Sequence, residues 1–151
     1  MEGTHGRSHR LRRGRYSETG RIYLVTTTTH DRYPVFQDIR AGRALVQALK
    51  TERRVDTLCF VVMPDHLHWL IQLNWIEPLE RIVGRVKSKS ARAVNQLFNH
   101  RGRLWQDGFH DRALRREEDL IAVARYVVAN PLRAGLVRSV GDYPLWDAVW
   151  L

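Results

Sequence analysis

The feature that most constrains the fold is a pair of extended segments joined by a short turn. Residues 57–63 (TLCFVVM) form a continuous apolar run, which is typical of a strand covered on both faces. Met63-Pro64-Asp65-His66 has turn chemistry, because proline pre-sets the first dihedral of a turn. Residues 66–73 then alternate, with Leu67, Trp69, Ile71 and Leu73 on one side and His66, His68, Leu70 and Gln72 on the other. We predict a strand on each side of this turn, with the leucine-bearing side packed.

The remaining segments complete an α+β pattern. Residues 22–29 are rich in β-branched side chains and predict a first strand, and residues 109–114 predict a short late strand. Helices are expected over 38–54, with Asp38 as its cap, over 78–98, and from the acidic run 117–119 to about residue 130, just before Pro131. The order β-α-β-β-α-β plus one helix is that of the ferredoxin-like split βαβ antiparallel sheet with an appended C-terminal helix. In that topology the strand bearing His66 and His68 is central.

The composition limits the classes of protein to which this chain can belong. The 151 residues include 25 Lys and Arg against 16 Asp and Glu, which gives a net charge of +9 and a pI near 10.6. This excess suits a polyanionic partner, because each neutralised phosphate releases counterions, although ribosome-associated and merely basic proteins share it. No apolar run is long enough to cross a bilayer, which argues against a membrane protein.

The expected organisation is simple. We expect residues 1–16 to be a flexible basic arm and residues 17–151 to form a single domain. No apolar segment follows the basic N-terminus, so no secretory signal is expected. Cys59 is the only cysteine, which excludes an internal disulfide, and we expect it to be inert core in a cytoplasmic protein.

Two weak signals point to a reactive centre. His66 and His68 are two residues apart on a strand, so both imidazoles project from one face, where they could share a divalent metal. Tyr126 lies roughly 140° from the centre of the apolar arc of its helix, and Asn130, four residues later, shares its side. The alternative for His66 and His68 is that they are ordinary polar residues on a partly exposed strand face. The alternative for Tyr126 and Asn130 is a surface tyrosine and an asparagine that ends the helix before proline.

A resemblance joins these signals. Residues 61–71 (VVMPDHLHWLI) resemble the His-hydrophobic-His strand of the single-tyrosine HUH transposases. Residues 104–137 (LWQDGFHDRALRREEDLIAVARYVVANPLRAGLV) are similar to the Trp-Gln and Tyr…Asn-Pro…Ala-Gly-Leu-Val blocks of the REP-associated tyrosine transposases, a branch of that family tied to repetitive extragenic palindromes. The resemblance covers about residues 20–146.

The resemblance implies a specific chemistry. It makes His66 and His68 ligands of Mg²⁺ or Mn²⁺, Tyr126 the nucleophile, and Asn130 the residue that completes the metal site. It also implies a single-stranded DNA substrate with a hairpin near the cleavage point. The strand would be cut through a 5′-phosphotyrosine intermediate and then rejoined without ATP. Two imidazoles by themselves suit Mn²⁺ better than Mg²⁺.

Candidate DNA contacts lie on the arm and on the second long helix. They are Arg12, Arg13, Arg15, Arg85, Lys87, Lys89 and Arg92, with solvated surface charge as the alternative. Trp105 and Phe109 are candidates to stack on unpaired bases, with core packing as the alternative. The segment DYPLWDAVW (142–150) is expected to pack back on the domain, which favours a monomer over a dimer in which Tyr126 serves a partner's site.

The sequence therefore predicts a metal-dependent DNA endonuclease and strand transferase, either of a mobile element or adopted by its host. The second hypothesis is a catalytically silent DNA- or RNA-binding protein that retains the fold. A structural metal site is disfavoured, because the chain has too few Cys and His at zinc spacing.

Overall fold

The computed structural model describes residues 20–115 and 119–148. Within these ranges five strands form one antiparallel sheet in the order β4-β1-β3-β2-β5. The strands are β1 (Ile22–Thr28), β2 (Val55–Met63), β3 (His66–Leu73), β4 (His110–Ala113) and β5 (Trp146–Ala148). The predicted arm and its Arg12, Arg13 and Arg15 lie outside the described residues.

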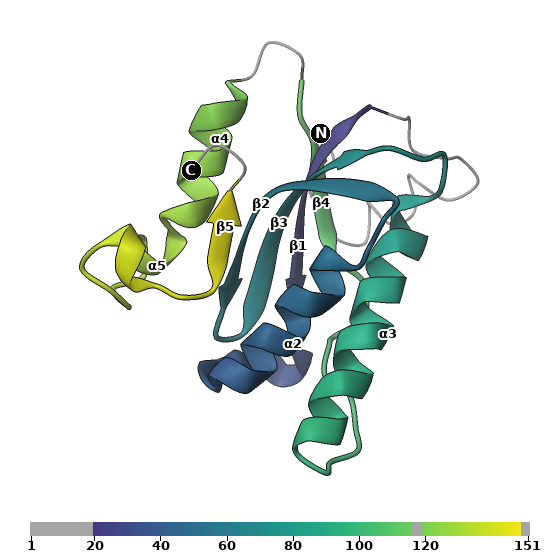
Figure 1. Cartoon of the computed structure of the whole chain (residues 1–151), viewed down its shortest axis with the longest axis vertical. Coiled ribbons are helices and arrows are strands. Elements are labelled where there is room, and N and C mark those ends of the chain that lie inside the picture. The colour runs from purple at the N-terminus through teal and green to yellow at the C-terminus, as the bar shows by residue number, and fades with distance from the viewer. Residues whose placement is uncertain (1–19, 116–118, 149–151) are drawn as a thin grey trace.

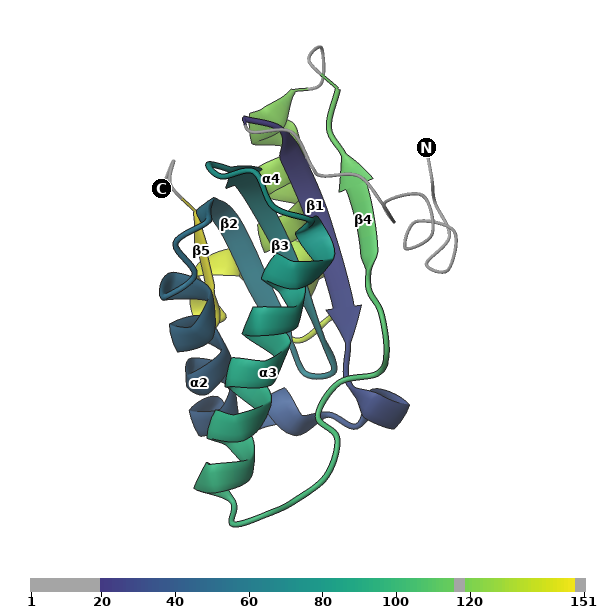
Figure 2. The same ribbon diagram turned by 90° about the vertical axis from the view of Figure 1, so that its right-hand side faces the viewer.

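The helices lie on both faces of this sheet. They are α2 (Ile39–Lys50), α3 (Leu79–Leu97), α4 (Leu120–Val128) and the single turn α5 (Asn130–Arg133). Short 3-10 turns span His30–Arg32, Val35–Gln37 and Val140–Asp142. Figure 2 shows α2 and α3 in front of the sheet and α4 behind it. The order of β1 to β4 and the central place of β1 and β3 confirm the predicted ferredoxin-like sheet.

The face toward α2 and α3 holds the larger core. Leu67, Trp69, Ile71 and Leu73 of β3 are almost fully buried there, among apolar side chains of both helices. The prediction that this side of β3 is packed is therefore confirmed. A second core cluster lies on the opposite face, where Leu70 packs with Ala124, Val127 and Val128 of α4. The histidine side of β3 is thus covered in part as well.

Local sequence signals explain where the helices start and stop. The Asp38 carboxylate accepts the backbone N–H of Arg40 at 2.9 Å and caps α2, as predicted, although α2 ends at Lys50 rather than near residue 54. Asp119 caps α4 by accepting the backbone N–H groups of Ile121 and Ala122. It therefore lies just before the helix, not inside the first turn.

The C-terminal segment packs against the sheet, as expected, and in addition it forms a strand. β5 pairs with the outer edge of β2 (Figure 1). The Tyr143 hydroxyl donates a hydrogen bond to the backbone oxygen of Val62. Burial of this phenol raises the pKa of Tyr143 to about 12. None of the helices in the described ranges combines the length and the apolar character that a bilayer crossing requires.

Candidate active site

The two histidines of β3 stand side by side on the sheet face that α4 covers in part. Their ring centroids are 4.8 Å apart, and the ring planes meet at 85°. Both side chains are partly buried. β3 begins at His66, directly after the turn at Pro64 and Asp65, so the pair lies at one end of the sheet, where His66 is opposite Met63 of β2 and Thr28 of β1. The expected shared face of the two imidazoles is therefore present.

Each imidazole is held through the same ring nitrogen. His68 Nδ1 is 2.9 Å from Thr26 Oγ1 on the neighbouring strand β1, and His66 Nδ1 is 2.7 Å from Asp65 Oδ1. These contacts fix the orientation of both rings and leave both Nε2 atoms available. Histidine ligands of metals are typically held in this way, with the second nitrogen bound to a carboxylate or another oxygen.

Asp65 connects this pair to the neighbouring loop. Its Oδ2 accepts a hydrogen bond from Arg32 Nε at 3.1 Å, while its backbone oxygen accepts from Thr29. Burial raises the pKa of the Asp65 carboxyl, but the hydrogen bond from His66 and the charges of His66 and Arg32 outweigh it and hold this pKa below its usual value. The carboxylate is therefore ionised at neutral pH.

His68 is kept neutral by its surroundings. Burial, followed by the charges of His66 and Arg133, lowers the pKa of His68 to about 4. A neutral imidazole is the form that binds a metal, because the ligand nitrogen must carry a free lone pair.

Tyr126 lies on α4 with its ring largely in solvent. The side chain is 62% exposed, whereas Ala124, Val127 and Val128 of the same helix are buried, so the tyrosine is outside the core as the helical arc predicted. Its hydroxyl has no hydrogen-bond partner among residues 20–115 and 119–148. The Arg133 guanidinium lies over the phenol ring, with Cζ 3.7 Å from the ring centroid.

Arg133 is the residue that the sequence interpretation missed. It belongs to α5, which Gly135 ends with a positive φ of 75°, a conformation that favours glycine. The charge of Arg133 acts on both the Tyr126 ring and His68. Arg133 therefore connects α4, which carries the tyrosine, with β3, which carries the histidines. The available signal was its position in the NPLRAG block, three residues after Asn130.

The donor set fits a divalent metal with oxygen ligands in its remaining positions. No group of three or more His, Cys, Asp and Glu side chains that could hold a metal occurs in the described part of the chain, so the two imidazoles would be supplemented by other oxygens. Asn130, the first residue of α5, is partly buried, and its amide makes no hydrogen bond to any described residue. Imidazole with amide, phosphate and water oxygens is a suitable set for Mn²⁺.

The candidate DNA contacts on α3 lie on the other face of the sheet from the histidines (Figure 2). Arg85 is engaged by Glu52 at 2.9 Å and by Glu77, and the Arg85 hydrogen bond is the main cause of a lowered Glu77 pKa. Lys87 donates to the backbone oxygen of Gln106, and burial lowers its pKa to about 8. Lys89 donates to Thr51, whereas Arg92 is exposed with no partner among the described residues.

The aromatic candidates belong to the core. Trp105 is 6% exposed, donates its indole N–H to Ser90 Oγ at 3.0 Å and packs against Phe36. Phe109 is buried as well. Neither ring has a free face for a base, so the structure supports the alternative of core packing. Cys59 is also buried, and burial raises the pKa of its thiol to about 12, in agreement with an inert core cysteine.

Comparisons with known proteins agree with one another. The family model of IS200-like transposases matches residues 19–130. The chain is 28% identical over 138 residues to a Haemophilus influenzae protein named as a REP-associated tyrosine transposase, covering 83% of this chain and 78% of that protein. It is 27% identical over 106 residues to the REP-associated tyrosine transposase of Escherichia coli K12, covering 68% of this chain and 59% of that protein.

Solved structures share the fold. A REP-associated tyrosine transposase bound to a REP hairpin aligns with a TM-score of 0.68 and 20% identity, over 87% of this chain and 79% of that one. A structure from Deinococcus radiodurans described as a transposase aligns with a TM-score of 0.54 and 19% identity, over 74% of this chain and 92% of that one.

Proposed function

This chain belongs to the IS200-like transposase family of enzymes that act on DNA, and from that premise we propose that it cuts and rejoins single-stranded DNA with Tyr126 as nucleophile. The observation that carries the proposal is the histidine pair, in which both Nδ1 atoms are occupied by oxygens and both Nε2 atoms are left for a metal. A buried pair with a purely structural role would not require the same nitrogen to be kept available on both rings.

In this proposal His66 and His68 would hold the metal through Nε2, and Asn130 would add its amide oxygen. Thr26 and Asp65 keep the two rings in the orientation that binding requires. A divalent metal held there, Mg²⁺ or Mn²⁺, would supply Lewis acidity toward the scissile phosphate. Arg32 donates a hydrogen bond to the other oxygen of Asp65, which favours the orientation in which this carboxylate holds His66.

Tyr126 carries out the bond exchange. Its phenol oxygen attacks phosphorus and loses its proton, the bond from phosphorus to the 3′ oxygen breaks, and that oxygen leaves as a 3′-hydroxyl after taking up a proton. The Arg133 guanidinium over the ring provides a fixed positive charge next to the phenolate that forms. Attack by a second 3′-hydroxyl on the phosphotyrosine reverses the steps, so joining needs no nucleotide triphosphate.

The substrate follows from the relatives. A solved structure with the same fold is a REP-associated tyrosine transposase bound to a REP hairpin, and two relatives are named as REP-associated. We therefore propose hairpin-bearing single-stranded DNA as the substrate of this chain. The net charge of +9 supports a nucleic acid partner. We also propose that the enzyme works in the cytoplasm. We propose that it acts as a monomer, since β5 and Tyr143 tie the segment after α5 back onto β2 of the same chain.

The test is an adduct assay. The protein is incubated with Mn²⁺ or Mg²⁺ and a REP hairpin oligonucleotide labelled at its 3′ end, the end that stays on the fragment joined to the tyrosine, and the products are separated under denaturing conditions. We expect a covalent protein–DNA adduct that disappears with EDTA, with Tyr126→Phe and with His66→Ala, while Tyr126→Phe retains hairpin binding. Binding without any adduct in the wild type would support the silent DNA-binding protein instead.

A further inference from the structure

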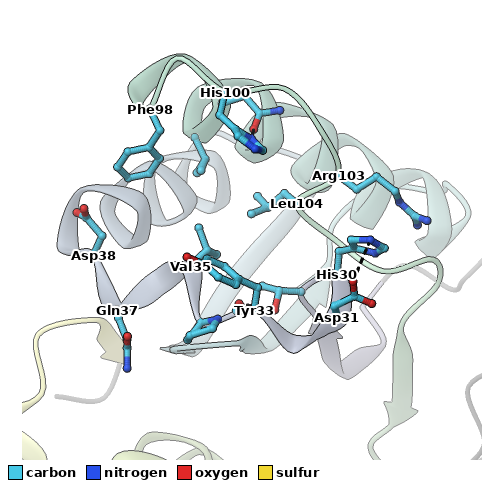
Figure 3. A pocket seen from close by; sticks show the side chains of 14 residues that line it. His30, Asp31, Tyr33, Val35, Gln37, Asp38, Phe98, His100, Arg103 and Leu104 are labelled. Carbon is cyan, nitrogen blue, oxygen red and sulfur yellow. Dashed lines mark hydrogen bonds and ion pairs between the residues drawn. The ribbon is translucent and has the colours of Figure 1, made fainter.

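A second feature of the molecule lies close to the histidine pair. A cavity of about 660 Å³ is formed by the segment 29–38, the C-terminal end of α3 and the loop 100–104. Figure 3 shows Val35, Leu104 and Phe98 around one hollow, with His30 and Arg103 on one side of it and Gln37 and Asp38 on the other. Its size falls within the range of pockets that hold small ligands. The cavity is therefore large enough for a nucleobase with its sugar.

The rim of the cavity carries exposed aromatic rings. Tyr33 is 69% exposed and Phe98 is 37% exposed, although both are large apolar side chains. The Arg40 guanidinium lies 5.0 Å from the centroid of Phe98, and Arg40 is itself paired with Asp38. Solvent-exposed aromatic rings beside cationic groups are the usual platform on which single-stranded nucleic acid stacks its bases.

The wall of the cavity is joined directly to the histidine site. Thr29, which lines the cavity, donates its backbone N–H to the Asp65 backbone oxygen at 2.9 Å. The carboxylate of Asp65 holds His66 at 2.7 Å on one oxygen and Arg32 at 3.1 Å on the other. A single residue, Asp65, thus links the cavity wall to the His66 ring, which places the cavity beside the histidine pair at the same end of the sheet.

The same wall has an unusual backbone. Asp31 and Arg32 have φ angles of 54° and 53°, in the left-handed region that residues other than glycine seldom adopt. The segment is nevertheless fixed, because His30 donates its N–H to the Leu104 backbone oxygen at 2.9 Å and Arg32 pairs with Asp65. Strain of this kind persists where the surroundings hold it, and it concentrates at ligand sites.

From these observations we propose that the cavity binds an unpaired nucleobase of the substrate strand, within a few nucleotides of the scissile phosphate. Tyr33 and Phe98 supply the stacking surfaces, and His30 lies at the side of the cavity where the hydrogen-bonding edge of the base is placed. This inference rests on the proposed function, because it places the base on the strand that Tyr126 cuts. The cavity thereby selects the position of the cut relative to the hairpin.

The experiment measures DNA affinity in EDTA by fluorescence anisotropy, so that it does not depend on cleavage. The probe is a labelled hairpin oligonucleotide with unpaired flanks, together with versions in which each flanking nucleotide in turn is abasic. We expect Tyr33→Ala and Phe98→Ala to raise the Kd about 5- to 150-fold, the range of one base–aromatic contact. Tyr33→Phe keeps the ring and should keep the affinity.

The matched control is Trp75→Ala. Trp75 is 56% exposed and stacks with Arg54, but it follows the opposite end of β3 from His66. One abasic position should weaken the wild type by at least the factor of Tyr33→Ala, and the same abasic position should have a smaller effect in Tyr33→Ala than in the wild type, because the stacking on Tyr33 is already lost there. Equal affinities for Tyr33→Ala, Phe98→Ala and Trp75→Ala, or abasic effects that add to Tyr33→Ala at every position, would overturn the proposal. If the wild type formed no adduct but Tyr33→Ala and Phe98→Ala still lost affinity for the hairpin, only the proposed cleavage would be overturned.

Discussion

Replacing Thr26 with valine tests whether the hydrogen bond on His68 serves metal binding. Valine has nearly the shape of threonine, so the change removes the oxygen that lies 2.9 Å from His68 Nδ1 and little else. Thr26 is partly buried, so water replaces this contact poorly. The imidazole then loses the partner that fixes its orientation and its tautomer.

The size of the effect can be estimated from the nature of the contact. Loss of an outer partner of a metal-binding histidine typically weakens metal affinity about 10- to 100-fold, which corresponds to about 1.4–2.7 kcal/mol. We therefore expect the Mn²⁺ concentration for half-maximal adduct formation to rise by that factor. The rate at saturating Mn²⁺ and the hairpin affinity in EDTA should stay close to the wild-type values, because neither depends on metal affinity.

The neighbouring residue provides the control. Thr27 carries the same side chain on the same strand but points to the other face of the sheet, and its buried hydroxyl has no partner among the described residues. Thr27→Val should leave the Mn²⁺ dependence unchanged and should not destabilise the fold, since it removes an unsatisfied polar group. If Thr26→Val and Thr27→Val required the same Mn²⁺ concentration, the role assigned to this hydrogen bond would be wrong.

Three further predictions concern other parts of the molecule. Arg133→Gln should slow adduct formation about 2- to 30-fold at unchanged hairpin affinity, since a cation–π contact contributes about 0.5–2 kcal/mol, and equal rates would remove Arg133 from the site. Arg85→Gln should lower the free energy of unfolding by about 1–3 kcal/mol in urea titrations, because it leaves the buried Glu77 without its main partner, whereas Arg92→Ala should leave stability unchanged. Cys59 should resist thiol reagents at pH 8 in the folded protein and react on unfolding. Because its folded pKa of about 12 exceeds the ordinary thiol value of 9.0, its contribution to stability is complete below about pH 9 and is lost as the pH rises toward 12, which pH-dependent urea melts can measure.

Much of the fold could be predicted because it depends on patterns within single segments. The alternation over His66 to Leu73 specifies a strand with two different faces, and the turn at Pro64 specifies its start, so the observed bounds agree with the expected ones. The order of strands and helices then leaves few topologies. β5 was not predicted as a strand, because its three residues become a strand only by pairing with the edge of β2.

The contacts around the site depend on pairing between segments, which a single sequence does not give. Thr26 meets His68 because β1 and β3 pair in one particular register, and any other register would give His68 a different neighbour. The position of Arg133 over Tyr126 depends on the end of α4 and the single turn of α5. Tryptophan is a residue type that often stacks on bases, which made Trp105 a candidate. Its burial depends on α3 and the segment 35–37, which pack around it.

The central claim is that Tyr126 becomes covalently joined to DNA, and peptide mapping tests it most directly. The adduct formed on hairpin DNA with Mn²⁺ is digested with nuclease and protease, and the peptides are analysed by mass spectrometry. We predict that the peptide containing Tyr126 gains the mass of a 5′-linked nucleotide on the phenol oxygen and that no other tyrosine is modified. A nucleotide found on Tyr33 or another side chain, or an adduct that persists in Tyr126→Phe, would contradict the account.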